Sequence, residues 1–404
     1  MGESAQYKET VELEITNKGE NNPMSNKMYK NERTAHLKKR MIGDTPFTIE
    51  WVLKALNDKQ SDWTNASAGR RILAQKIGEG KGYASNVYKL TVEFDRGEPY
   101  YLALKIPTPE IFLKKFEQPN ANESHVRSNI ENSIAAAHSR ECNFYRTFSG
   151  KGLCLPVIYA AQELIPGKQP GAILMQYMGD VGCNVPPHES FTLKQLVNAA
   201  HCFAYLHAYS LSLPQSQLQQ LHVFEQLPET WVNLFVQFAP KTIADDHSMQ
   251  SAYEKLKHLF ESVDFPKYLV YSATKKLGSV GEDLARIMCA SNPDIRREAE
   301  KVALDAYYET FTQEMKRRNL ENPHTKAQVI TAYRQAYVAQ ALLSLVGAHV
   351  LNDGREKLSG LDRRISEARY QNWLLRCKLA LEDAVQIVET DFPEWLDHEY
   401  KFQE

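Results

Sequence analysis

The segments with strand-like patterns gather before residue 180, and this distribution restricts the fold more than any other feature of the chain. Residues 86–94 alternate in polarity and are rich in β-branched and aromatic side chains, which is typical of a strand, and residues 99–107 are expected to form the next strand. A short glycine-containing turn, Asp95–Glu98, separates them, so we expect an antiparallel hairpin. Two further strands are expected within 155–164 and 171–178.

Helical periodicity dominates after residue 180. Leu193, Leu196 and Ala200 recur at the spacing of one helix face, and one main helix is also expected earlier, at about 131–148. The other expected helices lie at 229–238, 248–263, 281–290, 294–318, 325–351 and 363–388. A small sheet with one main helix, followed by a mainly helical region, predicts an α+β fold of two lobes.

The lobes are assigned from these patterns. Residues 1–45 are polar and irregular, and we expect a disordered tail there because little apolar surface is available for burial. Residues 46–178 form the expected sheet-containing N-lobe, and residues 179–404 the helical C-lobe. The most apolar stretch, 336–351, has only 16 residues, which is too short for a membrane span and predicts a buried core helix.

Composition excludes several classes of function. The 404 residues carry 48 basic and 50 acidic side chains, so no cationic excess drives nucleic-acid binding. The six cysteines include no CxxC pair, which argues against a zinc ribbon or a redox motif. We expect reduced thiols and a cytoplasmic location, since residues 1–15 also lack the apolar core of a signal peptide.

A glycine-rich segment, residues 77–88, lies between two strand-like runs, of which the first begins at Arg71. Glycine lets a backbone approach phosphate oxygens closely, and small polar residues can add donors. The candidate nucleotide-binding residues of this segment are Gly78, Gly80, Gly82, Ser85 and Asn86. An ordinary glycine-rich hairpin turn is the alternative. A Rossmann site fits less well, because a strand and not a helix follows the glycines.

Lys105 lies among apolar residues of an expected strand, where a cation is unfavourable unless an anion pairs with it. An edge lysine is the alternative. Glu141, on the next expected helix, suits a lysine that binds α- and β-phosphates. The glycine segment, the lysine and the glutamate follow one another along the chain in the order found in the nucleotide lobe of kinases. The last strand would then enter a hinge, Gln176, Tyr177 and Met178, whose backbone groups would bind adenine.

The ordered set of motifs resembles the choline-kinase-like (CHK), ecdysteroid-kinase-like family, whose members share a fold with aminoglycoside phosphotransferases and choline kinases. The resemblance rests on IGEGKGYASNVYKL, ALKIP, RECNFY, LPVIYA, ILMQYMGD, FAYLHAYSL and GSVGEDLARIM, and covers about residues 46–390. It implies a bilobal protein-kinase-like fold and transfer of phosphate from ATP, with Mg²⁺, to the hydroxyl of a small metabolite. It also implies that Lys105 and Glu141 form the ion pair, that Gly80 and Gly82 cover the phosphates, and that 176–178 form the hinge.

Two motifs that carry the chemistry of that family are missing. One is His-Gly-Asp followed by an Asn, and none of the twelve histidines is followed by Asp two residues later. The other is an Asp before an aromatic residue, which binds Mg²⁺. Asp62, Asp264 and Asp391 each precede Trp or Phe, but each stands at the wrong place along the chain. We therefore assign no catalytic and no metal-binding residue.

The missing motifs belong between the helix at 248–263 and the segment 278–284, where only the 13 residues 265–277 remain. A catalytic loop, a hairpin and a metal strand need roughly 30–40 residues. We expect Lys267–Tyr271 to be the strand that leads into the loop, and we predict a block deletion between 265 and 280. Point mutations that inactivate a kinase would keep the length of the chain. The short interval therefore suggests the hypothesis of a skipped exon, an isoform or a gene-model error. Sequencing the transcript across codons 265–280 tests this hypothesis.

The chain offers a few candidate substitutes for the missing acids. Asp180, Asp264 and the run Asp245–His247 are candidates, with helix caps or solvated loops as the alternative. By the resemblance, Asp283 braces the catalytic region, and His207 on an apolar helix face is expected to be a packed core histidine.

The sequence thus predicts a catalytically impaired member of a family of small-molecule phosphotransferases. The alternatives are a non-catalytic regulatory module that binds a nucleotide or metabolite, a truncated splice or gene-model product, and an active kinase that uses unrecognised residues. ATP and a small hydroxylated metabolite are the expected ligands; neither nucleic acid nor a membrane span is expected.

Overall fold

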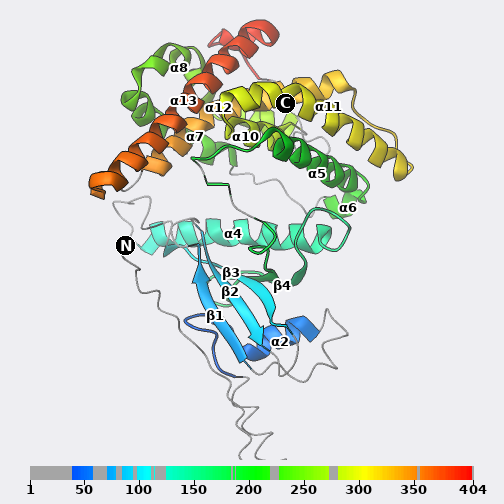
Figure 1. The fold of residues 1–404 in the computed structure, drawn as a ribbon. Coiled ribbons are helices and arrows are strands. Elements are labelled where there is room, and N and C mark those ends of the chain that lie inside the picture. Colours follow the sequence, from blue (N-terminus) through cyan, green and yellow to red (C-terminus); the bar gives the residue numbers. More distant parts are fainter. Residues whose placement is uncertain are drawn as a thin grey trace, which may run out of the picture. The chain divides into compact units, whose positions relative to one another are not determined.

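The computed structural model describes eleven stretches of the chain: 39–57, 71–78, 84–93, 98–110, 113, 124–182, 185–186, 188–218, 227–272, 281–352 and 355–402. The chain divides into two compact units, Met1–Cys183 and Asn184–Glu404, called here the first and the second unit (Figure 1). The predicted α+β class is confirmed, since the first unit holds a five-stranded sheet and the second holds helices in its described residues.

The sheet of the first unit is antiparallel throughout, with the strand order β1-β2-β3-β5-β4. Its strands are β1 (Arg71–Ile77), β2 (Ser85–Glu93), β3 (Tyr100–Pro107), β4 (Ile158–Gln162) and β5 (Ala172–Gln176). The hairpin expected from 86–94 and 99–107 is confirmed as β2 and β3. Burial alternates along β2, as expected of a strand with one covered face.

Helix α2 (Ile49–Asn57) covers one face of this sheet. The Thr48 hydroxyl accepts a hydrogen bond from the Trp51 amide and so begins the helix. Val52 and Leu56 then pack against strand residues such as Leu90 in one apolar cluster. This closed face is the core of the first unit. Residues 39–45 contribute to this core, since Ile42 is only 2% exposed. The predicted disordered tail, 1–45, therefore extends too far toward the C-terminus. Residues 1–38 lie outside the described residues.

Helix α4 (Ser124–Phe148) lies on the opposite side of the sheet from α2 (Figure 1). Cys142 of α4 packs against Ile158 of β4 and Ile173 of β5, so α4 covers the β4–β5 part of this second face. Helix α4 also contacts β3, and in the described part of the first unit no buried apolar cluster joins a helix to the β1–β2 part of this face. The sheet therefore has one closed face and one face that is half open.

The second unit contains a helical bundle. Its longer helices are α5 (Leu193–Leu211), α7 (Leu227–Asp245), α10 (Glu282–Cys289), α11 (Pro293–Arg317), α12 (Lys326–Asn352) and α13 (Gly360–Asp391), and its shorter ones are α6 (Gln215–Leu218), α8 (Gln250–Leu256) and α9 (Asp264–Lys267). Helix α5 begins with a capping box in which the Thr192 and Gln195 side chains each bond the other's backbone. The stretch 336–351 is a buried helix as predicted, with Leu342 and Leu345 in the core. No described helix is long and apolar enough to cross a membrane.

The prediction of a strand at Lys267–Tyr271 is wrong. Helix α9 is followed there by one π-helical turn, Tyr268–Ser272. Phe265 and Tyr268 pack into an aromatic cluster with Trp395 and Phe402 of the C-terminal segment, and this packing outweighs the β propensity of the run. A short apolar run does not distinguish a strand from a buried helix. The rest of the interval with the predicted deletion, 273–280, lies outside the described residues.

The cysteines are only partly as expected. Cys142, Cys289 and Cys377 are buried free thiols, and burial raises the pKa of the Cys142 thiol to about 11. That thiol therefore stays protonated near neutral pH. Cys154 and Cys202 are disulfide-bonded, so the expectation of reduced thiols is wrong for these two.

One buried arginine holds the loops of the second unit together. Arg376 of α13 is 1% exposed and donates to the Asn292 side chain and to the carbonyls of His188, Glu189 and Ala290, over 2.8–3.3 Å. These groups lie before α5 and at the α10–α11 junction. A planar guanidinium with five donors suits this role, because it satisfies several buried carbonyls at once.

Replacing Arg376 by methionine should destabilise the second unit by about 3 kcal/mol, because several buried acceptors lose their donor. Urea unfolding followed by helical circular dichroism measures the change. The matched control is Arg364→Met, on the same helix but exposed, which should change stability by less than about 0.5 kcal/mol. Equal effects of the two substitutions would contradict this role of Arg376.

Candidate nucleotide-binding site

Lys105 and Glu141 form an ion pair on the half-open face of the sheet. The Lys105 Nζ lies 2.6 Å from Oε1 and 2.7 Å from Oε2 of Glu141, so one ammonium bonds both carboxylate oxygens. Both side chains are somewhat under one-third exposed. The structure therefore brings together the two residues that the sequence predicted as partners, within reach of solvent and of a ligand.

The sheet register sets the direction of Lys105. It lies opposite Val87 of β2 and Ile173 of β5, so these three residues share one face. Counting in steps of two along the strands places Ala103 and Met175 on the same face. All four of these neighbours are apolar. Ile173 packs against Cys142 of α4, and Val87, Ala103 and Met175 form a floor of the kind that a planar ring packs on.

Two contacts between α4 and the β4 edge hold Glu141 in place. His138 Nε2 lies 2.9 Å from the Gln162 carbonyl, and Arg146 donates to the Ala161 carbonyl at 2.8 Å and to Glu163 at 2.6 Å. Glu141 lies between these two anchors on the helix. Burial lowers the pKa of His138, so the neutral ring is the form that fits this contact.

The glycine segment is described only at its ends. Gly78 follows β1 with a φ of +71°, a left-handed conformation that favours glycine. Ser85 and Asn86 begin β2 and lie opposite Pro107 and Ile106 of β3. Gly80 and Gly82 lie outside the described residues.

The expected hinge follows the end of β5. The Gln176 amide donates to the Val157 carbonyl at 2.8 Å, and the Tyr177 amide to the Tyr101 carbonyl at 3.4 Å. The Met178 carbonyl accepts from Val181 and Gly182 and so closes a turn. Within the described residues, the Met178 amide makes no backbone hydrogen bond. This N–H is the hinge donor that remains for a ligand.

The described residues do not fit a Mg²⁺ site. No group of three His, Cys, Asp or Glu side chains gathers in the part of the chain that the structure describes. Asp246 caps the short helix at 247–249 through the Ser248 amide, as the cap alternative predicted, and Asp245 accepts from the Tyr370 hydroxyl. Asp264 begins α9. None of these carboxylates replaces the missing metal ligands.

His207 is a linker within the bundle. Its Nδ1 lies 2.9 Å from the buried Tyr307 hydroxyl and its Nε2 lies 3.3 Å from Asp283 Oδ2, so α5, α10 and α11 meet at this ring. Burial raises the pKa of Asp283, but the hydrogen bond and the charge of His207 outweigh it and lower that pKa overall. The packed histidine expected from the sequence is present.

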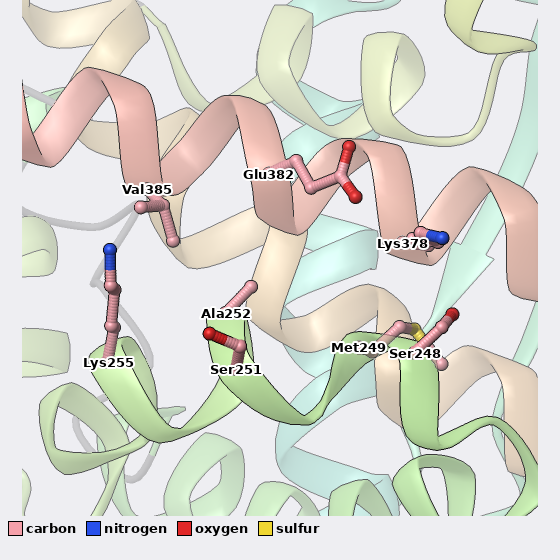
Figure 2. A pocket seen from close by; sticks show the side chains of 8 residues that line it. All are labelled: Ser248, Met249, Ser251, Ala252, Lys255, Lys378, Glu382 and Val385. Atoms are coloured by element: carbon pink, nitrogen blue, oxygen red, sulfur yellow. The ribbon is translucent and has the colours of Figure 1, made fainter.

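Cavities lie between helices in the described part of the second unit. One of about 490 Å³ lies between α11, α12 and α13, and there Tyr333 donates to Glu300 at 3.0 Å while burial raises the pKa of Glu300. Another, of about 260 Å³, lies between α8 and α13 (Figure 2). Figure 2 shows Lys378 and Glu382 of α13 across from Ser251 of α8. The sequence patterns gave no sign of either cavity.

The chain belongs to the DUF1679 family, whose model carries the description "Uncharacterized oxidoreductase dhs-27" and matches residues 42–276 and 273–390. The two matched pieces meet at 273–276, inside the interval 265–280 of the predicted deletion. The "Uncharacterized oxidoreductase dhs-27" of Caenorhabditis elegans is 22% identical over an alignment 347 residues long, which covers 74% of this chain and 42% of the relative. The chain thus spans less than half of that relative's length.

One solved structure also matches. It is described as a "putative aminoglycoside phosphotransferase" from Ralstonia eutropha, with 9% identity and a TM-score of 0.41 over 83% of this chain and 99% of that one. A likeness of this size decides neither the fold nor the activity of the present chain.

The anchoring of α4 should depend on pH. Because the pKa of His138 is lower in the folded state, its contribution to stability is complete above the ordinary histidine pKa of about 6.5 and is lost as the pH falls below it. Hydrogen-exchange protection of α4 should therefore fall between pH 7 and about pH 5. His138→Gln, which keeps a donor but does not titrate, should remove this pH dependence. An identical pH profile in the variant would contradict the assignment.

Proposed function

We propose that the first unit binds ATP as a kinase nucleotide lobe does, and that this chain binds the nucleotide without transferring its γ-phosphate. The observation that carries the proposal is the Lys105–Glu141 ion pair on the half-open sheet face. In kinases a strand lysine contacts the α- and β-phosphates, and a helix glutamate orients that lysine. The same two residue types stand here on the same kinds of element.

Each part of the nucleotide has a partner in this proposal. The Lys105 ammonium takes the α- and β-phosphates, with Gly80 and Gly82 as the predicted cover. Adenine lies on Val87, Ala103 and Met175 and accepts a hydrogen bond from the Met178 amide. Ser85 and Asn86, at the start of β2, supply polar groups near the phosphates.

The proposed loss of transfer follows from missing ligands and a missing base. Phosphoryl transfer needs a carboxylate that orients the hydroxyl and metal ions that neutralise the developing charge. The described residues offer no such cluster, and the family match breaks where the sequence predicts the block loss. Complete members of the resembled family would phosphorylate a hydroxylated metabolite with ATP and Mg²⁺; in this chain the step lacks its residues.

The word oxidoreductase in the name of the relative is not carried over to this chain. A dinucleotide-binding unit needs a parallel sheet and a glycine turn between a strand and a helix. Here the glycine segment joins two antiparallel strands, β1 and β2, and every described strand pairing is antiparallel. The relative has more than half of its length outside the match.

A second candidate function is a regulatory module that binds a metabolite. The cavity of about 490 Å³ between α11, α12 and α13 favours it, since its volume falls in the range of small-molecule sites. Glu300, with a raised pKa and a hydrogen bond from Tyr333, is a polar group of the kind that gives such a site its specificity. Nucleotide binding by the first unit is compatible with this role.

ATP should raise the thermal midpoint of the chain, because a ligand at 100 times its Kd stabilises the folded state by about 2.7 kcal/mol. Lys105→Ala should abolish the shift, whereas Lys168→Ala, an exposed lysine in the β4–β5 turn, should keep it. Release of γ-phosphate onto a panel of hydroxylated metabolites should stay at background in the wild-type chain. Absence of a shift at millimolar ATP would contradict nucleotide binding, and turnover that Lys105→Ala abolishes would contradict the loss of transfer.

A further inference from the structure

Lys89 of β2 lies between two aromatic rings on the same sheet face as Lys105. Its Nζ is 4.3 Å from the ring centre of Tyr101 on β3 and 4.4 Å from that of Tyr177 in the hinge. The Asp180 carboxylate, four residues beyond the end of β5, lies 4.0 Å away. Only 22% of the Lys89 side chain is exposed, so this cation is held and not merely solvated.

The register shows how far the side chain reaches. Lys89 lies opposite Ala103, and its ammonium lies between a ring on β3 and a ring beyond β5. The lysine therefore crosses β3 and joins β2, the strand that follows the glycine segment, to the hinge. In the described part of the sheet, backbone hydrogen bonds do not join β2 to β5 directly, because the two strands are not neighbours. The Lys89 side chain provides this connection.

The rings hold the ammonium more than the carboxylate does. Asp180 is 59% exposed at 4.0 Å, and an exposed pair of this kind is weak and screened by salt. Two aromatic faces within 4.5 Å of one ammonium provide cation–π contacts that salt screens less once they are partly desolvated. The main-chain tie at this point is long, at 3.4 Å from the Tyr177 amide to the Tyr101 carbonyl, so side-chain contacts take a larger part in fixing Tyr177.

We propose that Lys89 is a positioning residue for nucleotide recognition: by clamping Tyr177 against β3 it fixes the hinge, and with it the Met178 amide that meets the base. This inference rests on the proposed ATP binding of the first unit. Lys89 acts through the hinge and does not contact the phosphates, which Lys105 binds in the proposed function. Its loss should therefore weaken recognition of the base and leave recognition of the phosphate chain unchanged.

Titration calorimetry with two probes, ATP and inorganic tripolyphosphate, separates these effects. Lys89→Met keeps the length of the stem and removes the charge, and it should weaken ATP binding about 10-fold while tripolyphosphate binding stays within about 2-fold. Lys89→Arg, which also stacks on aromatic rings, should restore ATP binding to within about 3-fold of wild type. Lys168→Met is the matched control and should bind both probes as the wild-type chain does.

The outcomes separate this inference from the proposed function. Wild-type ATP binding with unchanged affinity in Lys89→Met overturns the positioning role alone. Equal losses for ATP and tripolyphosphate, or no rescue by arginine, indicate a merely structural residue and also overturn it. No ATP binding by the wild-type chain overturns the proposed function and the positioning role together. Should Lys89→Met not fold, Tyr177→Leu makes the same test from the hinge side, with the same selective loss for ATP expected.

Discussion

The bidentate contact between Lys105 and Glu141 is the interaction on which the first unit depends for any role with a nucleotide. An ammonium on an otherwise apolar strand face needs an anion, and the glutamate of α4 provides it while both groups stay accessible. The pair also sets the distance between α4 and β3, so the helix cannot shift without exposing an unpaired charge. His138 and Arg146 hold the same helix to the β4 edge, which leaves the carboxylate little freedom.

One face of the sheet stabilises the first unit, and the other face is the proposed binding surface. The face under α2 is closed by a continuous apolar cluster, so the strands keep their positions when the other face meets a ligand. On that other face, α4 covers the β4–β5 part and contacts β3 through the Lys105–Glu141 pair, and Val87 and Ala103 lie on the same face of β2 and β3. Lys89 lies beside them and ties this surface to the hinge. A rigid scaffold with one open half-face is the arrangement expected of a binding site on a small sheet.

Much of this architecture could be predicted from the sequence, because strand alternation and helix periodicity follow burial directly. The hairpin of β2 and β3 was of this kind, whereas the pairing of Lys105 with Glu141 was expected from the order of the motifs and from the family resemblance. The run Lys267–Tyr271 was not, since its aromatic neighbours Trp395 and Phe402 come from the far end of the chain. The clamp on Lys89 also escaped prediction: it needs the strand order β3-β5, which brings Tyr177 beside Tyr101 and which no local pattern encodes.

The central claim is that Lys105 and Glu141 act as one unit in binding ATP, and a double-mutant cycle on ATP affinity tests it most directly. If the glutamate works by orienting the lysine, Lys105→Met, Glu141→Gln and the double variant should each lose about the same affinity, so the two single effects do not add. Additive losses, or a Glu141→Gln variant that binds ATP as tightly as the wild-type chain, would contradict the account.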